Sequence, residues 1–338
     1  MNRTSLVFER PGAVSLRTEP APLPGPGEVL VRTRFSAVSS GTERLFYRGR
    51  IPADMPLDTA IPSLADRAGY PFKYGYAAAG QVVALGGGVP DDWSGQRVFA
   101  FNPHESHFTA NPSDLFELPE EVGWRDGVFL PNMETAVSFL MDGRPVLGET
   151  AAVFGLGIVG LLTTALLCRF PLAAVVAIDP LPNRRELARG LGGRVHPAAP
   201  DEAVGILSDL TSGAGPDLVY EVSGNPAALD QAVSIAGFDT RILVGSWYGD
   251  RRVALDLGSR FHRSRVRIES SQVSTLAPEF RGRWTHRRRL AAAMDMIREI
   301  GPSRFISHEF DFARAPHAYE LLDRTPEAVL QMVFRYGA

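Results

Sequence analysis

The sequence predicts an α/β protein with a β-rich first domain and a second domain built on a doubly wound parallel sheet. Three observations lead to this prediction. From Glu28 to Val38 apolar and polar side chains alternate, which is the period of a half-buried strand. From Glu149 onward, short apolar strands alternate with helical stretches, a pattern typical of a parallel sheet covered by helices. A glycine-rich turn joins the first strand of this second part to its first helix.

The elements of the first part are short strands separated by glycine-rich and proline-rich turns. Residues 22–27 contain three prolines and two glycines just before the first of these strands. The expected strands cover 28–38, 80–85 and 96–101, and a helix is expected over 132–141. This portion is therefore expected to be an irregular β domain with long loops.

The second part begins with an apolar strand over 151–154 and a helix over 158–167. Further strands are expected at 173–178, 218–221, 241–244 and 266–269, and further helices at 226–235 and 287–300. The tail from about Ser303 is expected to return to the first domain. The predicted boundaries are 1–140, completed by 301–338, and 141–300.

Composition restricts the class of function. The 338 residues are 45% apolar and 22% charged with a formal charge of −3, which gives no electrostatic reason to expect a nucleic acid partner. No apolar run reaches the roughly 18 residues that a membrane span needs, and the N-terminus lacks an apolar signal core, so we expect no membrane association and a cytoplasmic protein. The single cysteine, Cys168, excludes an internal disulfide and a Cys-rich zinc lobe.

The glycine-rich turn predicts a dinucleotide site. Gly155-Leu156-Gly157-Ile158-Val159-Gly160 lies between a strand and an apolar helix, and Asp179 ends the next strand. A carboxylate there accepts hydrogen bonds from a ribose diol and repels a 2′-phosphate, so Asp179 favours NAD; Arg184 and Arg185 leave NADP open. The expected cofactor residues are Gly155, Leu156, Gly157, Ile158, Val159, Gly160, Asp179, Arg184, Gly224, Gly245, Ser246 and Ser271.

Two further segments carry a family resemblance. Gly75-Tyr76-Ala77-Ala78-Ala79-Gly80 keeps the glycine spacing of the zinc alcohol dehydrogenase signature, and Ser40-Gly41-Thr42-Glu43-Arg44-Leu45 resembles the polyol dehydrogenase motif Cys-Gly-Ser-Asp-x-His. Over nearly its whole length the chain resembles a medium-chain dehydrogenase/reductase. The resemblance implies a GroES-like catalytic domain, an inserted Rossmann domain and a C-terminal return. The Ser-Gly-Thr-Glu version is also similar to zinc-free branches, including the bacteriochlorophyllide dehydrogenases.

The positions that would carry metal ligands in that family have changed in this chain. Ser40 and Leu45 replace the Cys and His of one motif, Tyr76-Ala77 replaces the His-Glu of the other, and Asn132 falls near a further Glu ligand. These substitutions leave no plausible tetrahedral site, so we expect no metal.

A side chain must then supply or accept the proton when hydride moves. The resemblance places Thr42 at the hydroxyl that relays the proton in zinc enzymes. Tyr76 and Lys73 lie on the loop where ligands would stand, and a Tyr–Lys pair could lower the pKa of the phenol. The alternative is that Tyr76 fills the emptied cavity and Lys73 is solvated. Glu43 and Glu134 are further acid–base candidates.

The expected substrate pocket contains Ser40, Arg44, Tyr47, Asn132 and Glu134. Arg44 could recognise an anionic or polyhydroxylated substrate, although a solvated loop is the simpler interpretation. His104-Glu105-Ser106-His107 has spacing compatible with a metal, but no further ligands stand out nearby. The basic run 281–289 is interpreted as an exposed helix start or a subunit contact.

Together these features predict a zinc-independent oxidoreductase that transfers hydride between NAD(P) and a secondary alcohol or ketone, such as a polyol, cyclitol or secondary-metabolite intermediate. The partner is a small-molecule substrate, and a homodimer is compatible with the sequence. Two alternatives stay open: a reductase of activated C=C bonds of the enoyl or quinone type, and a non-catalytic nucleotide-binding protein.

Overall fold

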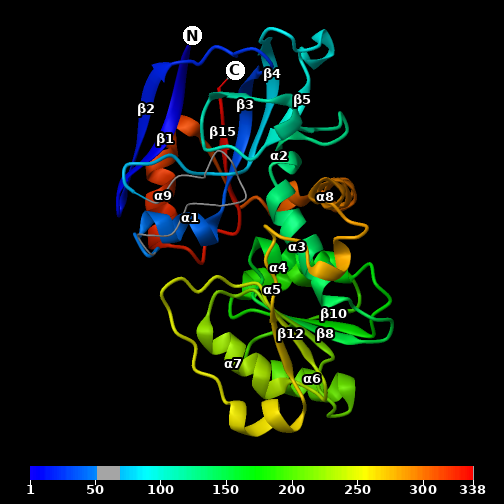
Figure 1. Cartoon of the computed structure of the whole chain (residues 1–338). Helices are drawn as coiled ribbons and strands as arrows, with labels where there is room; N and C mark the ends of the chain where they lie inside the picture. The colour runs from blue at the N-terminus through cyan, green and yellow to red at the C-terminus, as the bar shows by residue number, and fades with distance from the viewer. Residues whose placement is uncertain (52–68, 338) are drawn as a thin grey trace. The chain divides into compact units, whose positions relative to one another are not determined.

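The computed structural model describes residues 1–51 and 69–337. They form two compact units, Met1–Pro131 with Ile297–Ala338, and Asn132–Met296 (Figure 1). The second unit begins within helix α3 (Leu130–Gly143) rather than at 141, because Phe139 of this helix packs on Tyr220 of the second unit with ring centroids 6.2 Å apart. Among the described helices, none combines the length and apolar character that a bilayer crossing requires.

The first unit is built around a seven-stranded sheet in the order β14-β15-β3-β4-β5-β7, with β6 also paired to β3. The longest strand, β3, is buried at three consecutive residues at each end and alternates in burial only near its middle, so the half-buried strand that its sequence predicts is more deeply buried than expected. The strands of the unit are β1 (Asn2–Arg10), β2 (Ala13–Pro20), β3 (Val29–Val38), β4 (Ala78–Leu85), β5 (Arg97–Ala100), β6 (His107–Ala110), β7 (Phe116–Glu117), β14 (His308–Asp311) and β15 (Met332–Arg335).

The C-terminal tail completes this sheet. Strand β15 pairs antiparallel with β3, with Met332 opposite Val38, so the end of the chain lies in the sheet that its first third begins. The helices of the unit are α1 (Ser40–Tyr47), α2 (Trp124–Gly127) and α9 (Ala315–Arg324). Helix α1 occupies a stretch that the sequence analysis interpreted as a loop, so that interpretation was wrong: the buried side chains of Glu43, Phe46 and Tyr47 fall on one face of a helix.

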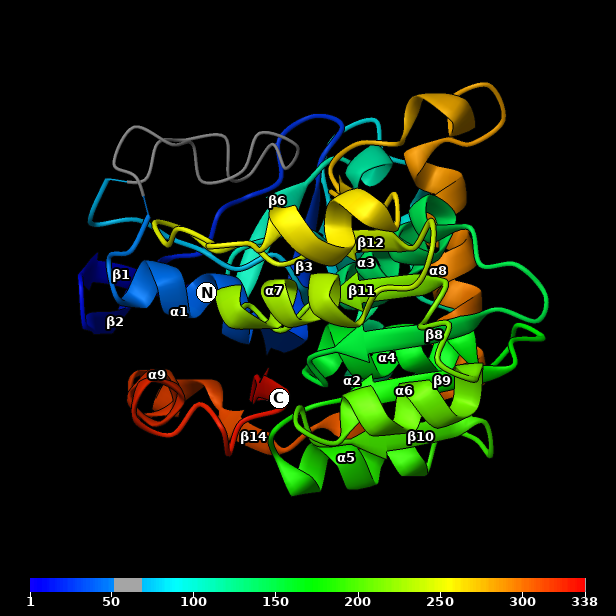
Figure 2. The same ribbon diagram turned by 90° about the horizontal axis from the view of Figure 1, so that it is seen from below.

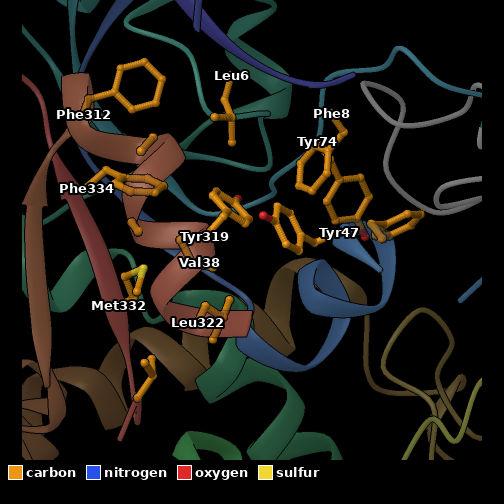
Figure 3. Close-up of a cluster of buried hydrophobic side chains, with 14 of the residues drawn as sticks. Leu6, Phe8, Val38, Tyr47, Tyr74, Phe312, Tyr319, Leu322, Met332 and Phe334 are labelled. Atoms are coloured by element: carbon orange, nitrogen blue, oxygen red, sulfur yellow. The ribbon is translucent and has the colours of Figure 1, made fainter. Parts of the chain in front are cut away.

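Helices α1 and α9 pack around an aromatic core (Figure 3). Tyr319 of α9 stacks on Tyr47 of α1 at 5.9 Å and meets Phe8 of β1 edge-on at 5.3 Å. Offset and edge-on ring pairs of this kind add about 0.5–1.5 kcal/mol each beyond the area that they bury. The cluster therefore holds the N-terminal hairpin β1–β2, α1 and the C-terminal return together.

The second unit is a six-stranded parallel sheet in the order β10-β9-β8-β11-β12-β13. Its strands are β8 (Thr150–Phe154), β9 (Ala174–Ile178), β10 (Val195–Ala198), β11 (Leu218–Glu221), β12 (Arg241–Val244) and β13 (Arg267–Ser270). Its helices are α4 (Ile158–Leu167), α5 (Pro182–Arg189), α6 (Ala203–Thr211) and α7 (Pro226–Ile235), with a π-helical turn η4 (Leu257–Phe261) and helix α8 (His286–Ile300), which runs across the boundary between the units.

The order of these strands reverses between β8 and β11, which makes this the switch point of a doubly wound sheet. Helices α6 and α7 lie on the face of the sheet nearest the viewer in Figure 2. Strands β8 and β9 are buried along their whole length, as expected of parallel strands covered on both faces. Ligands of such sheets bind outside the carboxyl ends of the strands beside the switch point.

One buried ion pair fastens α3 to α8 inside the second unit. The guanidinium of Arg289, 1% exposed, lies 2.9 Å from Glu134 Oε1 and donates to Ser138 Oγ at 2.7 Å. The basic run 281–289 is exposed at most positions, but Arg289 is buried, so the expectation that the whole run is an exposed helix start was wrong at this residue.

We predict that Arg289→Met lowers the free energy of unfolding by about 3–5 kcal/mol, because it leaves the Glu134 carboxylate buried without its cation. Arg288→Met is the matched control, since Arg288 is exposed, and it should change stability by about 0.5 kcal/mol or less. Urea unfolding followed by circular dichroism measures both. Equal midpoints for the two variants would contradict the assignment.

Candidate functional site

The glycine-rich turn after β8 has the geometry of a phosphate cradle. Gly155 has a φ of +93°, and a Cβ there would lie 2.4 Å from the backbone of Ser223. A Cβ on Gly160 would lie 1.8 Å from the Gly155 oxygen. Gly157, in contrast, precedes α4 as its N-cap and has nothing within 4 Å of its Cβ position. Gly155 and Gly160 are required because a side chain would collide with the neighbouring backbone. Gly157 leaves open space beside the N-terminus of α4, where the helix dipole attracts negative charge.

Asp179 ties the end of β9 to this turn. Its buried carboxylate accepts from the backbone N–H of Leu156 at 2.8 Å and of Leu181 at 2.9 Å. The guanidinium of Arg184 lies 3.8 Å from the same carboxylate, whereas Arg185 donates to the backbone oxygens of Asp179 and Pro180. The carboxylate is thus fixed beside the glycines at the end of β9.

The loops that follow β11 and β12 meet at the same edge of the sheet. The Gly224 N–H donates to Ser246 Oγ at 2.8 Å, and the Gly245 N–H donates to the Glu221 carbonyl at 2.9 Å. Gly245 is also packed against the Phe139 ring, which leaves no space for a Cβ. Ser271, after β13, is buried and donates to Asp142 of α3. Of the four expected strand-end residues, Gly224, Gly245 and Ser246 therefore lie together. The hydroxyl of the fourth, Ser271, is hydrogen-bonded to a side chain of α3 instead.

Sequence reasoning missed Glu221 as a member of this edge. Its fully buried carboxylate accepts hydrogen bonds from the Ser223 N–H at 2.9 Å, from the Ser223 hydroxyl and from the Tyr248 hydroxyl. Burial, reinforced by this carboxylate, raises the pKa of Tyr248, which keeps the phenol a donor. The available signal was an acidic residue at a predicted strand end, three residues before Gly224. Glu221 binds the loop after β11 to the loop after β12.

In the first unit, the two segments that resemble zinc-binding motifs lie around the start of α1. Ser40 is the first residue of the helix, and its buried Oγ has no hydrogen-bond partner among the described residues. The Tyr76 hydroxyl donates to Oγ of Ser39, the residue at the N-cap position of the same helix, and Ala77 is buried. Thr42 lies half-buried on the first turn. The structure therefore brings together three hydroxyl side chains, those of Ser39, Ser40 and Thr42, and the Tyr76 phenol attached to one of them.

The predicted pairing of Tyr76 with Lys73 was wrong. The Lys73 ammonium lies 2.7 Å from Glu105 Oε1 and 2.9 Å from Glu19 Oε1, and these are its partners among the described residues. The two carboxylates compensate its charge, so it does not stabilise a phenolate at Tyr76.

Glu43 is enclosed rather than open to a substrate. Its fully buried carboxylate accepts from the Ser39 N–H at 2.7 Å and from the Tyr319 hydroxyl, and it lies 3.2 Å from His104 Nε2. Burial, with the Glu43 carboxylate as the next cause, raises the pKa of Tyr319 far above its usual range. Glu43 thus has the environment of a structural carboxylate with every oxygen satisfied.

Most of the expected substrate-pocket residues are engaged in contacts within their own unit. Arg44 lies 3.8 Å from Asp323 of α9, and burial lowers the pKa of its guanidinium. Tyr47 is buried against Tyr319, and burial raises the pKa of its phenol. Glu134 is bound to Arg289, while Asn132 is half-buried on α3. Two members of this set have a buried polar atom without a hydrogen-bond partner among the described residues, Ser40 at Oγ and Arg44 at Nε.

The chain is similar to known dehydrogenases both in sequence and in fold. The family model described as zinc-binding dehydrogenase matches residues 159–288. The chain is 24% identical to D-guloside 3-dehydrogenase of Escherichia coli K12 over 90% of this chain and 92% of that protein. It is 27% identical to (R,R)-butanediol dehydrogenase of Bacillus subtilis 168 over 66% of this chain and 71% of that protein.

Solved structures share the whole fold. A short chain alcohol dehydrogenase from E. coli CFT073 in complex with NADH superposes with a TM-score of 0.78 at 19% identity, covering 99% of each chain. The 2R,3R-butanediol dehydrogenase of B. subtilis superposes with a TM-score of 0.80 at 17% identity, covering 98% of this chain and 99% of that one. The chain belongs to the medium-chain dehydrogenase/reductase superfamily. Its two units are the GroES-like and Rossmann domains of that superfamily.

We predict that Glu221→Gln weakens NADH binding about tenfold. Ser223 and Tyr248 donate to different oxygens of the carboxylate, and an amide keeps only one of these acceptors, so the loops after β11 and β12 are no longer both held. Glu149→Gln is the matched control: Glu149 pairs with Arg241 at the opposite, amino-terminal edge of the sheet, 2.6 Å away. Calorimetric titration with NADH gives both dissociation constants. A Glu221→Gln value equal to that of the control would refute the role.

Proposed function

We propose that this protein is a zinc-independent, NAD-linked oxidoreductase that interconverts a secondary alcohol and a ketone. One observation carries the proposal: the Gly155–Gly160 turn, Asp179 and the loops after β11 and β12 lie at one edge of the Rossmann sheet, while the segments that bear metal ligands in zinc dehydrogenases hold hydroxyl groups and a methyl group. The relatives named above, which act on a guloside and on butanediol, support a hydroxylated substrate such as a polyol or cyclitol.

The residues at the edge of the Rossmann sheet fit a nicotinamide cofactor. The Gly157 cradle at the start of α4 would receive the pyrophosphate, Asp179 the adenosine ribose, and the loops at Gly224 and Ser246 the nicotinamide half. When bound, the cofactor accepts or supplies the hydride. The structure of an E. coli dehydrogenase with NADH and that of a Sinorhizobium meliloti dehydrogenase with NADP show that this fold accepts either cofactor.

The residues at the ligand positions do not fit zinc. Ser40 offers a neutral hydroxyl, Ala77 a methyl group, and the Tyr76 phenol donates to Ser39. His104 and Glu43, an imidazole and a carboxylate beside these segments, are paired with each other. Within residues 1–51 and 69–337, no group of three or more His, Cys, Asp and Glu side chains is arranged to hold a metal ion. Thiolate, imidazole or carboxylate donors are what a zinc site needs.

Hydroxyl groups must then move the proton in this proposal. Ser40 Oγ, buried and unpaired among the described residues, can accept or donate one hydrogen bond to the substrate oxygen. Thr42 lies two residues along the same helical turn, and Tyr76 reaches the helix start through Ser39. A hydroxyl that donates to a developing alkoxide lowers the barrier without a metal.

The first test is metal content and turnover together. We expect the purified protein to contain well under one zinc per chain by elemental analysis, and to reduce NAD with a panel of secondary alcohols at a rate that neither chelators nor added Zn²⁺ change. One equivalent of zinc lost together with activity would overturn zinc independence. Oxidation of NADH by enones but not ketones would favour a C=C reductase, and cofactor binding without any turnover would favour a non-catalytic protein.

Cofactor preference gives a second test. Asp179→Ala should raise the Kd for NADH about tenfold and reduce discrimination against NADPH, because the variant loses the ribose acceptor and its repulsion of a 2′-phosphate. Arg184→Ala is the comparison variant, expected to weaken NADPH and leave NADH nearly unchanged. Tighter binding of NADPH than NADH by the unaltered protein would show that Arg184 outweighs Asp179.

The hydroxyl groups give a third test. Tyr76→Phe and Thr42→Val should each slow single-turnover hydride transfer, and a group that takes part in acid–base catalysis typically contributes about 10²–10⁴-fold. Tyr70→Phe is the matched control, since its hydroxyl donates to the Phe46 carbonyl instead of to a side chain at the helix start. If Tyr76→Phe and Thr42→Val both match the control, the proton donor lies elsewhere.

A further inference from the structure

His104 is the feature of the first unit that neither the family resemblance nor the proposed chemistry explains. Its imidazole is fully buried, like the Glu43 carboxylate 3.2 Å away. On its other side, Nδ1 lies 2.7 Å from Ser36 Oγ, and Ser36 in turn lies 2.9 Å from the Tyr336 hydroxyl. A buried imidazole with a partner at each nitrogen has a fixed ring orientation.

The direction of the central hydrogen bond follows from chemistry. A carboxylate only accepts, so Nε2 of His104 carries a proton and donates to Glu43. In the tautomer whose ring proton is on Nε2, Nδ1 accepts from the Ser36 hydroxyl, which itself accepts from Tyr336. This assignment satisfies every polar group in the chain from Glu43 to Tyr336.

His104 contacts both segments in which zinc dehydrogenases carry ligands. Through Glu43 it reaches the start of α1, because the other Glu43 oxygen accepts from the Ser39 N–H at 2.7 Å. Its own backbone N–H donates to the Tyr74 carbonyl at 3.1 Å. Gly75, with a φ of +122°, lies so close that a Cβ would be 2.8 Å from His104 Cδ2. The loop 73–77 therefore closes directly over the imidazole.

The aromatic core keeps this arrangement in place. Tyr319 approaches Glu43 from α9, among the rings of Phe8, Tyr47 and Phe334 shown in Figure 3. Phe334 also meets the His104 ring edge-on at 5.2 Å. The titratable groups facing the pair are thus Tyr319 and Tyr336, and burial raises the pKa of both phenols, so they remain donors.

We propose that His104 is a positioning residue which, in the absence of ligand side chains for a metal, fastens the α1 segment to the 73–77 loop and so sets the positions of Ser40, Thr42 and Tyr76. A metal ion would tie these same two segments by direct bonds to each. Here His104 connects the two segments instead: its Nε2 donates to Glu43 of α1, its backbone N–H donates to the Tyr74 carbonyl, and its ring packs against Gly75. This inference rests on the proposed function only where it concerns catalysis.

The structural part can be tested without turnover by hydrogen–deuterium exchange of the whole protein. His104→Leu should raise exchange about tenfold or more in peptides covering 36–47 and 73–79, with the Rossmann domain unchanged. His104→Gln, whose amide can place an N–H toward Glu43, should restore protection. His107→Leu, three residues away with its Nε2 unpartnered among the described residues, should leave both segments protected.

The kinetic part uses the same variants. His104→Leu should lower single-turnover hydride transfer about 10–100-fold with an unchanged Kd for NADH, and His104→Gln should recover most of the rate, because a displaced donor costs rate rather than cofactor affinity. If His104→Leu does not fold, Ser36→Ala removes the Nδ1 partner and should give a smaller change in the same direction.

The outcomes separate the two proposals. Unchanged exchange in either segment of His104→Leu, or in both segments of Ser36→Ala, overturns the positioning role whatever the protein catalyses. Increased exchange in a protein with no dehydrogenase activity leaves the positioning role standing and overturns the proposed function. Increased exchange with an unaltered rate of hydride transfer overturns the link between His104 and catalysis.

Discussion

The buried carboxylate of Glu43 needs hydrogen-bond donors, and the structure of the first unit depends on supplying them. Glu43 is removed from water, and an unpaired carboxylate in that position would cost several kcal/mol. Its three donors come from the start of its own helix, from His104 in the middle of the first unit, and from Tyr319 in the C-terminal return. The N-terminal, central and C-terminal parts of this unit must therefore be in place together, and the hydroxyl groups around Ser40 are set by that requirement.

Buried carboxylates also hold loops in place in the Rossmann domain. Asp179 directly follows β9, and Glu221 is the last residue of β11. Each buried carboxylate accepts a hydrogen bond from a backbone N–H of the loop that follows its strand. A loop fastened to a strand end loses conformational freedom before any ligand arrives, so less ordering remains to be done on binding. Gly155 and Gly160 let neighbouring backbone segments pack closely at this edge, and the two carboxylates fix the positions of the loops around them.

Local patterns in the sequence were sufficient for the fold class and for most of the second unit. The strands at 218–221 and 241–244 and the helices at 158–167 and 226–235 begin and end where the pattern of apolar residues places them. Short elements with weak patterns were missed, among them α5, whose exposed face carries Asn183 and Glu186, and the hairpin β1–β2. Helix α1 was missed because residues 40–45 were compared with the ligand positions of a zinc-binding motif. The spacing of the buried residues Glu43, Phe46 and Tyr47, which is that of a helix, was not considered.

The polar contacts of the catalytic domain could not be predicted from the sequence for a different reason. His104 and Glu43 are 61 positions apart, and Tyr319 is 276 positions from Glu43, so no spacing rule connects them. Lys73 was assigned to Tyr76 because the two are close in sequence, whereas folding gives it Glu19 and Glu105. The match to the zinc-binding dehydrogenase model spans 159–288, which lies within the Rossmann domain and contains neither Ser40 nor Tyr76. That match is evidence about the nucleotide half, and the chemistry of the other half must be judged from the side chains that this chain has placed there.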